Sequence, residues 1–244
     1  MPLQEHPHLR SASRPRTTGV PAVFLDRDDT LIYCNSVTPD GDLGDPSLVE
    51  LMPDVYEALR TLRQEGFTLV CVSNQAGVAR GRYGPAEVDR VNARLNEMLD
   101  GMIVDFRYCP FHPEAVVEEY RHPDHPDRKP NPGMLLRSAA DLGVELARSW
   151  IVGDKPRDCE AGSRAGTGSA LICGEHGRTA EGWLMARDIS DAAEAIVRES
   201  RLATVHLARQ QIQAERAGVS GSVEERGGGE AEKPRGETDV RSAS

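Results

Sequence analysis

The stretch "FLDRDDTLI", residues 24–32, places three aspartates, Asp26, Asp28 and Asp29, directly after a short apolar run. The run "AVFLD" (22–26) is typical of a buried strand. Carboxylates this close in sequence repel one another, and keeping several of them charged in one place is unfavourable. We therefore expect the cluster to have a function, and the residues that follow it along the chain indicate which one.

Strand and helix signals alternate outward from this stretch. Short apolar runs predict strands at 22–26, 67–74, 103–110, 149–154 and 168–174. Helical spacing of apolar residues, with Pro near several starts and Gly near several ends, predicts helices at 53–66, 84–102, 132–143, 156–166 and 190–201. This alternation indicates an α/β fold whose mostly parallel sheet is covered on both faces.

Composition sets limits on the kind of protein. The chain has 244 residues and a formal net charge of −10, which disfavours nucleic acid as the main partner. Its five cysteines form no C-x-x-C pair, which fits a reducing compartment. No secretory signal and no apolar run of about 18 residues is present, so we expect a cytoplasmic protein without a membrane partner. A monomer is expected.

The ends of the chain differ in composition from its middle. Residues 1–19 are polar and rich in Pro and Arg, which predicts a flexible lead-in to a domain at 20–200. Residues 201–244 are expected to form a mostly disordered tail, because Gly, Ser and charged residues dominate its end. A weaker helical pattern at 201–214 allows the last helix to continue into that tail.

Polar residues follow the predicted strands at the point where each strand ends. Asp26 ends the first strand, Ser73 and Asn74 end the second, and Asp154 ends the fourth. Lys129 lies in the loop before a predicted helix. A single aspartate after a strand is often only a turn former or a helix cap. Ligands of parallel α/β sheets bind at the carboxyl ends of the strands, however, so the joint pattern indicates a site there.

This set of side chains suits phosphoryl transfer. Asp26 and Asp154 can share Mg²⁺, which prefers oxygen ligands, while Lys129 neutralises phosphate charge. In an extended segment residues i and i+2 point the same way, so Asp26 and Asp28 would face the substrate while Arg27 turns aside. One carboxylate can attack phosphorus, and the other can protonate the leaving oxygen.

Four motifs in this order resemble a known family. "FLDRDDTLI", "CVSNQAGVARG", "RKPNPGM" and "IVGDKPRD" are similar to the motifs of the haloacid dehalogenase superfamily of phosphatases. More narrowly, they resemble its heptose 1,7-bisphosphate 7-phosphatases and histidinol-phosphatases. The resemblance covers about residues 20–198. It implies a Rossmann-like three-layer sandwich with a minimal cap made of short loops only.

The resemblance also implies roles for the acidic residues. Asp26 would be the nucleophile that forms an aspartyl-phosphate. Asp28 would be the general acid/base, and its backbone carbonyl would ligate Mg²⁺ together with Asp26 and Asp154. Asp158 would position the last motif loop.

The remaining implied roles concern the substrate. Ser73 and Lys129 would hold the phosphoryl group, and Arg128 would contact the substrate beyond it. Three further residues would line or flank the substrate site, namely Asn74, Gln75 and Lys155.

Asp29 and the loop after it depart from the family pattern. The family usually has Gly where Asp29 stands, and we interpret Asp29 as a turn residue, not a metal ligand. The following loop, "YCNSVTPDGDLGD" (33–45), lacks the charged and Tyr residues typical of the family. This leaves the identity of the substrate open.

A third departure concerns zinc. Many members bind a structural zinc through C-x-H and a later C-x-C, but Phe111 stands at the expected His position and the later cysteines are missing. A remade site would need Cys109, His112, His125 and Asp127. Structural zinc sites strongly prefer thiolates. We therefore expect no structural zinc, Pro-rich packing in its place, and His122 and His125 at the surface.

The favoured function is a Mg²⁺-dependent phosphatase acting on a small phosphorylated sugar, the 7-phosphate of a heptose bisphosphate. Histidinol phosphate is the alternative substrate. A phospho-receiver domain would carry its acceptor aspartate at the end of the third strand, where this chain has "RYCP" (107–110). An inactive binding module on the same fold is the remaining alternative, although all core motif positions are filled.

Overall fold

The computed structural model describes residues 19–38 and 41–224. Its strands are β1 (Ala22–Leu25), β2 (Thr68–Asn74), β3 (Asp105–Cys109), β4 (Trp150–Gly153), β5 (Gly168–Ile172), β6 (Gly177–Arg178) and β7 (Leu184–Ala186). Its α-helices are α1 (Val55–Gln64), α2 (Ala76–Ala79), α3 (Pro85–Met98), α4 (Gly133–Leu142), α5 (Pro156–Ala165) and α6 (Ile189–Glu224). Short 3-10 helices are η1 (Pro46–Leu48), η2 (Glu118–Tyr120) and η3 (Leu146–Arg148).

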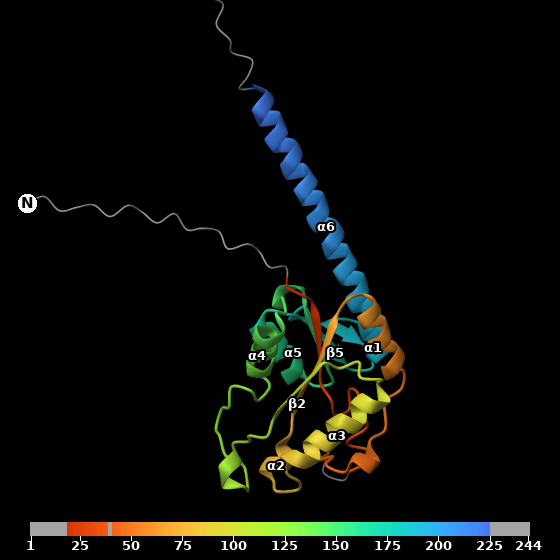
Figure 1. Cartoon of the computed structure of the whole chain (residues 1–244), viewed down its shortest axis with the longest axis vertical. Coiled ribbons are helices and arrows are strands. Elements are labelled where there is room, and N and C mark those ends of the chain that lie inside the picture. The colour runs from red at the N-terminus through yellow and green to blue at the C-terminus, as the bar shows by residue number, and fades with distance from the viewer. Residues whose placement is uncertain (1–18, 39–40, 225–244) are drawn as a thin grey trace, which may run out of the picture. The chain divides into compact units, whose positions relative to one another are not determined.

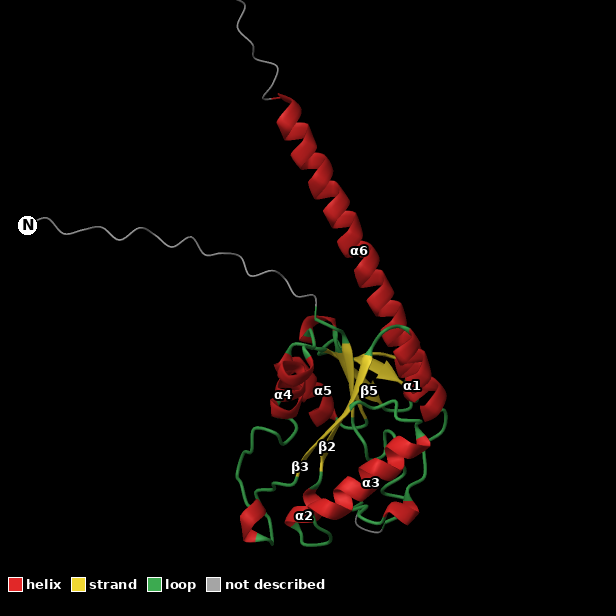
Figure 2. Cartoon of the chain, viewed as in Figure 1, coloured by secondary structure: helices red, strands yellow, loops and turns green. Residues whose placement is uncertain are grey.

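The strands form one sheet in the order β3-β2-β1-β4-β5-β7-β6. All neighbouring pairs are parallel except β6 and β7. This confirms the predicted α/β class with a mostly parallel sheet (Figure 2). The sequence did not predict β6, β7 or α2, because elements of two to four residues carry too little periodicity to be recognised.

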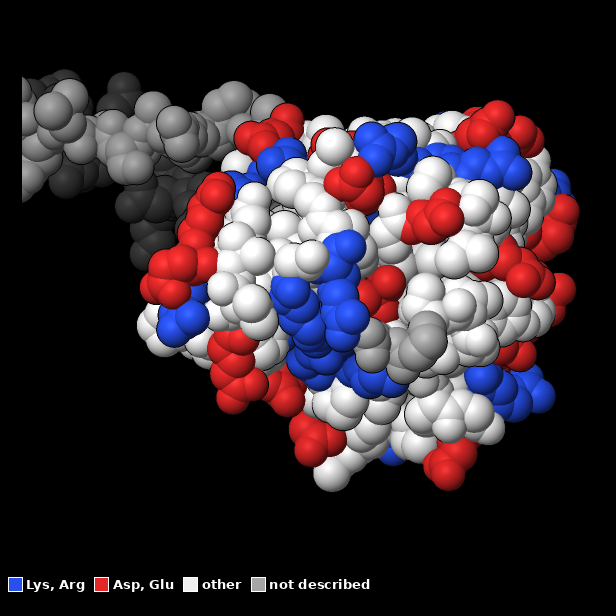
Figure 3. All heavy atoms as spheres, turned by 90° about the horizontal axis from the view of Figure 1, so that it is seen from below, with Lys and Arg blue, Asp and Glu red and all other residues white. Residues whose placement is uncertain are grey.

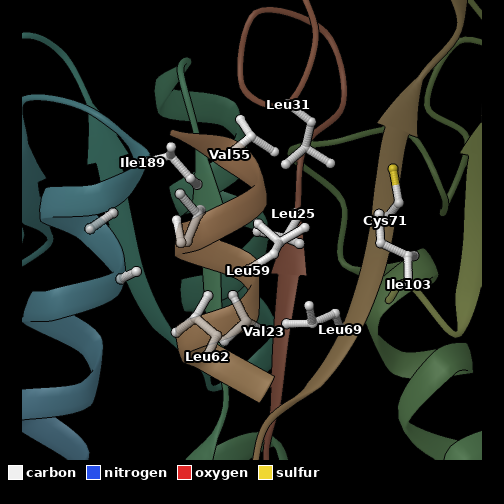
Figure 4. Close-up of a cluster of buried hydrophobic side chains, with 14 of the residues drawn as sticks. Val23, Leu25, Leu31, Val55, Leu59, Leu62, Leu69, Cys71, Ile103 and Ile189 are labelled. Carbon is white, nitrogen blue, oxygen red and sulfur yellow. The ribbon is translucent and has the colours of Figure 1, made fainter. Parts of the chain in front are cut away.

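Successive residues of β1 supply cores on opposite faces of the sheet. Val23 and Leu25 pack into one apolar cluster with α1, α3 and the start of α6, and Figure 4 shows the α1 side of that contact. Ala22 and Phe24 belong to a second cluster with α4 and α5. Helices thus cover both faces (Figure 1), which confirms the three-layer sandwich. The alternation also holds the end of β1 rigidly in the middle of the sheet.

The two longest insertions carry little regular structure. The described residues between β1 and α1 form only η1 and isolated bridges, and those between β3 and α4 form only η2 and one bridge. This agrees with a minimal cap of short loops. Both insertions follow strands at their carboxyl ends, so they lie at the edge of the sheet where the motif residues gather.

The C-terminal part of the chain forms a separate unit. The compact unit ends at Arg198, and the second unit begins at Glu199 within α6. Helix α6 continues to Glu224, beyond the end at residue 214 that the sequence predicted. The strong helix formers "AERA" at 214–217 favour part of this extension, whereas the Gly, Ser and Val residues of 218–223 give no sequence reason for the rest. The rest of the expected tail and the lead-in at 1–18 lie outside the described residues. None of the described helices is long and apolar enough to span a membrane.

Candidate active site

Asp26 lies directly after β1 and is only 3% exposed. The Nζ amine of Lys129 lies 2.8 Å from Asp26 Oδ1 and 2.7 Å from Asp158 Oδ1. Lys129 and Asp158 are also buried. A cation between two carboxylates offsets their repulsion. The loop before α4 and the first turn of α5 thus meet the end of β1 at one buried point.

Charge and burial act on this group together. Burial, and then the charge of Asp158, raise the pKa of Asp26 to about 7, against the opposing effect of Lys129. Burial alone would lower the pKa of Lys129, but the charges of Asp158 and Asp26 outweigh it and raise this pKa. Lys129 is therefore cationic, and a bound cation beside Asp26 would favour the carboxylate form of this nucleophile candidate.

Asn74 fixes the backbone that carries Lys129. Its side-chain Nδ2 donates to the Lys129 carbonyl at 3.0 Å, and the Lys129 N–H donates to Asn74 Oδ1 at 3.0 Å. The Lys129 amine also donates to the carbonyl of Val72 at 2.7 Å. The end of β2 thus positions Lys129 by both its backbone and its side chain.

Asp154 follows β4 and completes an acidic group. Asp26, Asp154 and Asp158 each bring a carboxylate oxygen within 4.8 Å of the others. Burial raises the pKa of Asp154, while the Lys155 amine at 2.6 Å opposes this rise. Three carboxylates at this separation have the donor chemistry that Mg²⁺ requires. The structure therefore brings together the predicted acidic residues, and it adds Asp158 to the group.

Asp158 has partners that limit its freedom to bind a cation. One oxygen pairs with Lys129, and the other accepts from the Lys155 backbone N–H at 3.1 Å. The second bond caps the start of α5. This geometry agrees with the expected role of Asp158 in positioning the loop.

The sequence reasoning about Arg27 was wrong. Its side chain does not turn aside but is buried against Asp28, with Nε 3.0 Å from Asp28 Oδ1. The alternation rule fails here because β1 ends at Leu25, so residues 26–28 no longer form a strand. The sequence carries no signal for this burial, because the partners of Arg27 include residues that are distant along the chain.

Ser73 and Gln75 lie on the other side of Asp28. Ser73 Oγ is 3.3 Å from Asp28 Oδ2, and the Gln75 amide Nε2 donates to the same oxygen at 2.7 Å. Gln75 is only 1% exposed. Its amide is buried against Asp28 and Ser73, and Gln75 is not among the residues that line the open pocket, so its expected place at the substrate site stays a prediction. Asn74, in contrast, does reach the open pocket.

An open pocket of about 240 Å³ lies in front of these residues, and Asp28 and Asp154 form part of its wall. Four cationic side chains also line it, namely Arg80, Arg128, Lys155 and Arg157. Figure 3 shows Lys and Arg side chains gathered beside acidic ones on one face of the molecule. The pocket thus has acidic walls and a basic rim, which suits a phosphorylated substrate held beside a cation.

Comparison with known proteins identifies the family. The sequence pattern of the family described as HAD-hydrolase-like matches residues 127–197. The D-glycero-β-D-manno-heptose-1,7-bisphosphate 7-phosphatase of Mesorhizobium japonicum is 41% identical over 170 residues, covering 68% of this chain and 70% of the relative. The protein of that name from Escherichia coli K12 is 37% identical over 157 residues, covering 63% and 79%. This chain belongs to the heptose-bisphosphate phosphatase family. It is an enzyme of the phosphatase class.

Solved structures of this family have the same fold. A HAD-like phosphatase from Mesorhizobium loti matches with a TM-score of 0.65 at 36% identity, over 78% of this chain and 90% of that chain. A D,D-heptose 1,7-bisphosphate phosphatase from B. bronchiseptica matches with a TM-score of 0.61 at 26% identity, over 73% and 99%. The latter was crystallised with magnesium and phosphate.

Within this phosphatase, Asp29 shapes the turn that leaves the site. Its backbone is left-handed, with φ of 55°, a conformation that Gly adopts without strain. Its carboxylate accepts from the backbone N–H groups of Cys34 and Asn35 at 2.9 and 3.0 Å. The predicted turn role is confirmed. The loop after Asp29 is thereby closed by a side chain that glycine would lack.

An aromatic cluster lies among the residues considered as zinc ligands. The ring of Phe111 stacks on His125 with a centroid distance of 4.0 Å and an angle of 7°. His122 and Tyr120 meet Phe111 edge to face. His122 and His125 are therefore half-buried rather than fully exposed, and their rings pack against Phe111.

The four zinc candidates are only partly brought together. Cys109 Sγ lies 3.9 Å from His125 Nδ1, and Asp127 Oδ2 lies 3.8 Å from the same nitrogen. Asp127 is also paired with Arg137, however, and His112 Nδ1 accepts from the Glu114 backbone. Among the described residues, only Asp26, Asp154 and Asp158 form a group of three or more Asp, Glu, Cys or His side chains close enough to hold a metal ion. Stoichiometric zinc in an elemental analysis of the purified protein would overturn the expectation that no structural zinc binds.

Proposed function

We propose that this enzyme removes the 7-phosphate of D-glycero-D-manno-heptose 1,7-bisphosphate in a Mg²⁺-dependent reaction through an aspartyl-phosphate on Asp26. The relatives at 41% and 37% identity carry this substrate in their names, with the β anomer. The observation that carries the proposal is the position of the basic rim. It lies directly outside the buried acidic group, where a second phosphate of the substrate would come to rest.

The residues of the buried centre divide the chemistry. Asp26 attacks phosphorus, and Asp28 protonates the leaving oxygen and later takes a proton from water. Lys129 neutralises charge on the phosphoryl group, and the Ser73 hydroxyl donates to it. For this to occur, Lys129 must exchange part of its contact with Asp26 and Asp158 for phosphate oxygens. Asn74 keeps the Lys129 backbone in place during that exchange.

The acidic group fits a divalent cation. Asp26 and Asp154, with the backbone carbonyl of Asp28, would hold Mg²⁺, and Asp158 would support them through Lys129. Bound Mg²⁺ neutralises the phosphate and offsets the repulsion among these carboxylates. Asp154 lines the open pocket, and its one ion-pair partner among the described residues, Lys155, is exposed, so a cation that enters the pocket can compete for this carboxylate.

The basic rim favours a bisphosphate over a simple phosphate ester. Arg128 is half-buried, and its Nη1 donates to the Phe111 carbonyl at 3.2 Å, which fixes its direction. Burial lowers the pKa of Arg128, and the charges of Arg157 and Arg80 lower it further. The guanidinium groups of these three arginines repel one another, so an anion that binds between them is stabilising. The 1-phosphate of the substrate supplies such an anion.

Cysteine chemistry supports a reducing compartment. All five cysteines are free thiols, and four of them are buried. We place the enzyme in the cytoplasm on this basis.

A phosphate-release assay tests the proposed function. The substrates are heptose 1,7-bisphosphate as both anomers, heptose 7-phosphate, histidinol phosphate and common hexose phosphates, each with Mg²⁺ or EDTA. We expect the highest kcat/KM for the heptose bisphosphate, release of one phosphate per molecule, and loss of turnover in EDTA. A higher kcat/KM for histidinol phosphate, or turnover unaffected by EDTA, would contradict the proposal.

A further inference from the structure

Arg27 is a charged residue whose side chain has no exposed surface. Its guanidinium forms a two-point contact with Asp28, with Nε 3.0 Å from Oδ1 and Nη2 3.3 Å from Oδ2. Removing a guanidinium from water is unfavourable, and a buried ion pair returns little net stability compared with apolar packing. Stability alone therefore does not explain why a charge is buried at this position.

The other atoms of the Arg27 guanidinium are also anchored. Nη1 donates to Asn92 Oδ1 at 3.1 Å, and Nη2 donates to Gln75 Oε1 at 2.8 Å. Tyr83 donates its hydroxyl to the same Gln75 oxygen at 2.9 Å. Asn92 lies on α3, Gln75 follows β2, and Tyr83 precedes α3. Contacts from separate elements thus prevent the guanidinium plane from rotating.

This network treats the two oxygens of Asp28 differently. Oδ2 is contacted by Arg27 Nη2, by Gln75 Nε2 at 2.7 Å and by Ser73 Oγ at 3.3 Å. Oδ1 has one hydrogen-bond donor among residues 19–38 and 41–214, the Nε of Arg27. Since a carboxylate oxygen has two lone pairs, Oδ1 keeps acceptor capacity. Asp28 also lines the open pocket, and of its two oxygens Oδ1 has the fewer donors, so we take Oδ1 as the oxygen available for reaction.

We propose that Arg27 is a positioning residue, which holds the Asp28 carboxylate so that Oδ1 meets the leaving oxygen of the substrate. Arg27 does not touch the substrate itself. The proposal rests on the proposed role of Asp28 as general acid. A purely structural role, in which Arg27 only joins α3 to the end of β1, makes different predictions.

The leaving group of the substrate distinguishes these roles. A sugar alkoxide must be protonated as it departs, whereas p-nitrophenolate is a stable anion that departs without a proton. A misplaced general acid therefore slows an alkyl ester more than an aryl ester. The quantity to compare is kcat/KM, because it covers the reaction up to departure of the leaving group and excludes hydrolysis of the phospho-enzyme.

The experiment measures kcat/KM of Mg²⁺-loaded Arg27→Gln and Arg27→Lys on heptose 1,7-bisphosphate and on p-nitrophenyl phosphate. We expect Arg27→Gln to lower the value for the sugar ester about 100-fold and that for the aryl ester less than about tenfold. Arg27→Lys keeps the charge but loses the two-point contact, so its kcat/KM for the sugar ester should lie between the values of wild type and Arg27→Gln. Arg107→Gln is the matched control, since Arg107 of β3 pairs with Asp105 on the same strand and with Asp141 of α4.

Milder variants keep the test decisive if Arg27→Gln does not fold. Tyr83→Phe and Asn92→Ala each remove one hydrogen bond from the network that holds Arg27, without changing a contact of Asp28. Each should lower kcat/KM for heptose 1,7-bisphosphate by about 3- to 10-fold and that for p-nitrophenyl phosphate less. Equal losses on both esters in all of these variants, or none, would overturn the proposal while the wild type stays active. A wild type that hydrolyses neither ester would instead refute the proposed function.

Discussion

The buried centre of the active site and its open rim pair their charges in opposite ways. In the centre, Lys129 lies within 2.8 Å of two carboxylates, and Arg27 contacts Asp28 at two points. At the rim, Arg128 and Arg157 have no carboxylate partner among residues 19–38 and 41–214, although both line the pocket. The charges of the centre are thus paired before substrate arrives. At the rim, Arg80 and Lys155 pair with Asp42 and Asp154, so only Arg128 and Arg157 are left uncompensated among the described residues.

This difference assigns catalysis to the centre and attraction of the anionic substrate to the rim. Compensated charges in a buried site are held in fixed positions, which is the condition for accelerating a reaction. Uncompensated charges of one sign attract an anion and lose their mutual repulsion when it binds. We therefore expect changes in the centre to affect every substrate, and changes at the rim to affect only substrates with a second phosphate.

The largest effect is expected from Asp26→Asn. The amide cannot attack phosphorus, so kcat should fall by at least about 10⁴-fold for the bisphosphate and for a simple phosphate ester alike. Phosphate release with each substrate measures both losses. Because Asn is similar in size and Lys129 keeps its ion pair with Asp158, no buried charge is left without a partner, so the melting temperature should not fall. A substrate-selective loss would contradict the assignment of Asp26 to the centre.

Arg157→Ala should affect the rim alone. Loss of one charge-assisted contact to the second phosphate should lower kcat/KM for heptose 1,7-bisphosphate by about 10- to 100-fold. The value for heptose 7-phosphate should stay within about threefold of wild type, because that ester has no second phosphate. Arg164→Ala is the control, since Arg164 lies on the same helix and pairs with Glu160 outside the pocket. Equal losses on both substrates would remove the distinction between rim and centre.

Magnesium affinity should depend on pH through the centre. Burial raises the pKa of Asp26 to about 7, so below that pH the cation must displace a proton. The affinity should fall by up to about tenfold for each pH unit below 7 and level off above it. Calorimetry in buffers of different ionisation enthalpy reports the released proton. An affinity that is constant between about pH 5.5 and 7 would show that Asp26 is already ionised there.

The smallest effect is expected at the edge between the two regions. Asp29→Gly keeps the left-handed backbone at φ of 55° and loses only hydrogen bonds to the turn at Cys34 and Asn35. Unfolding free energy should fall by about 1 kcal/mol, and kcat/KM should stay within about threefold of wild type. Thermal melts and phosphate release measure the two values. Complete loss of activity would mean that Asp29 has a direct role in the reaction.

The sheet and the gathering of polar residues were predictable because both follow from short-range patterns. Apolar runs identify buried strands, and parallel strands bring their carboxyl ends to one edge. Asp26, Asn74 and Asp154 therefore lie together as the sequence predicted. The division of roles among them rests on the family resemblance and stays a prediction.

Contacts that depend on tertiary structure were not predictable. The orientation of Arg27 is set by Asn92, which is distant in sequence, and the strand rule does not apply beyond Leu25. Burial of Gln75 depends on the same network. The stack of Phe111 on His125 follows from the path of a loop without periodic structure. In each case the sequence identified the residue type but not its neighbour.

One measurement tests the central claim most directly. Enzyme turning over heptose 1,7-bisphosphate with Mg²⁺ is quenched in acid, digested and mapped by mass spectrometry. We expect a phosphoryl group on the peptide that contains Asp26, which is absent in Asp26→Asn and in enzyme treated with EDTA. Phosphorylation of a different residue, or none in an enzyme that is releasing phosphate, would contradict the mechanism.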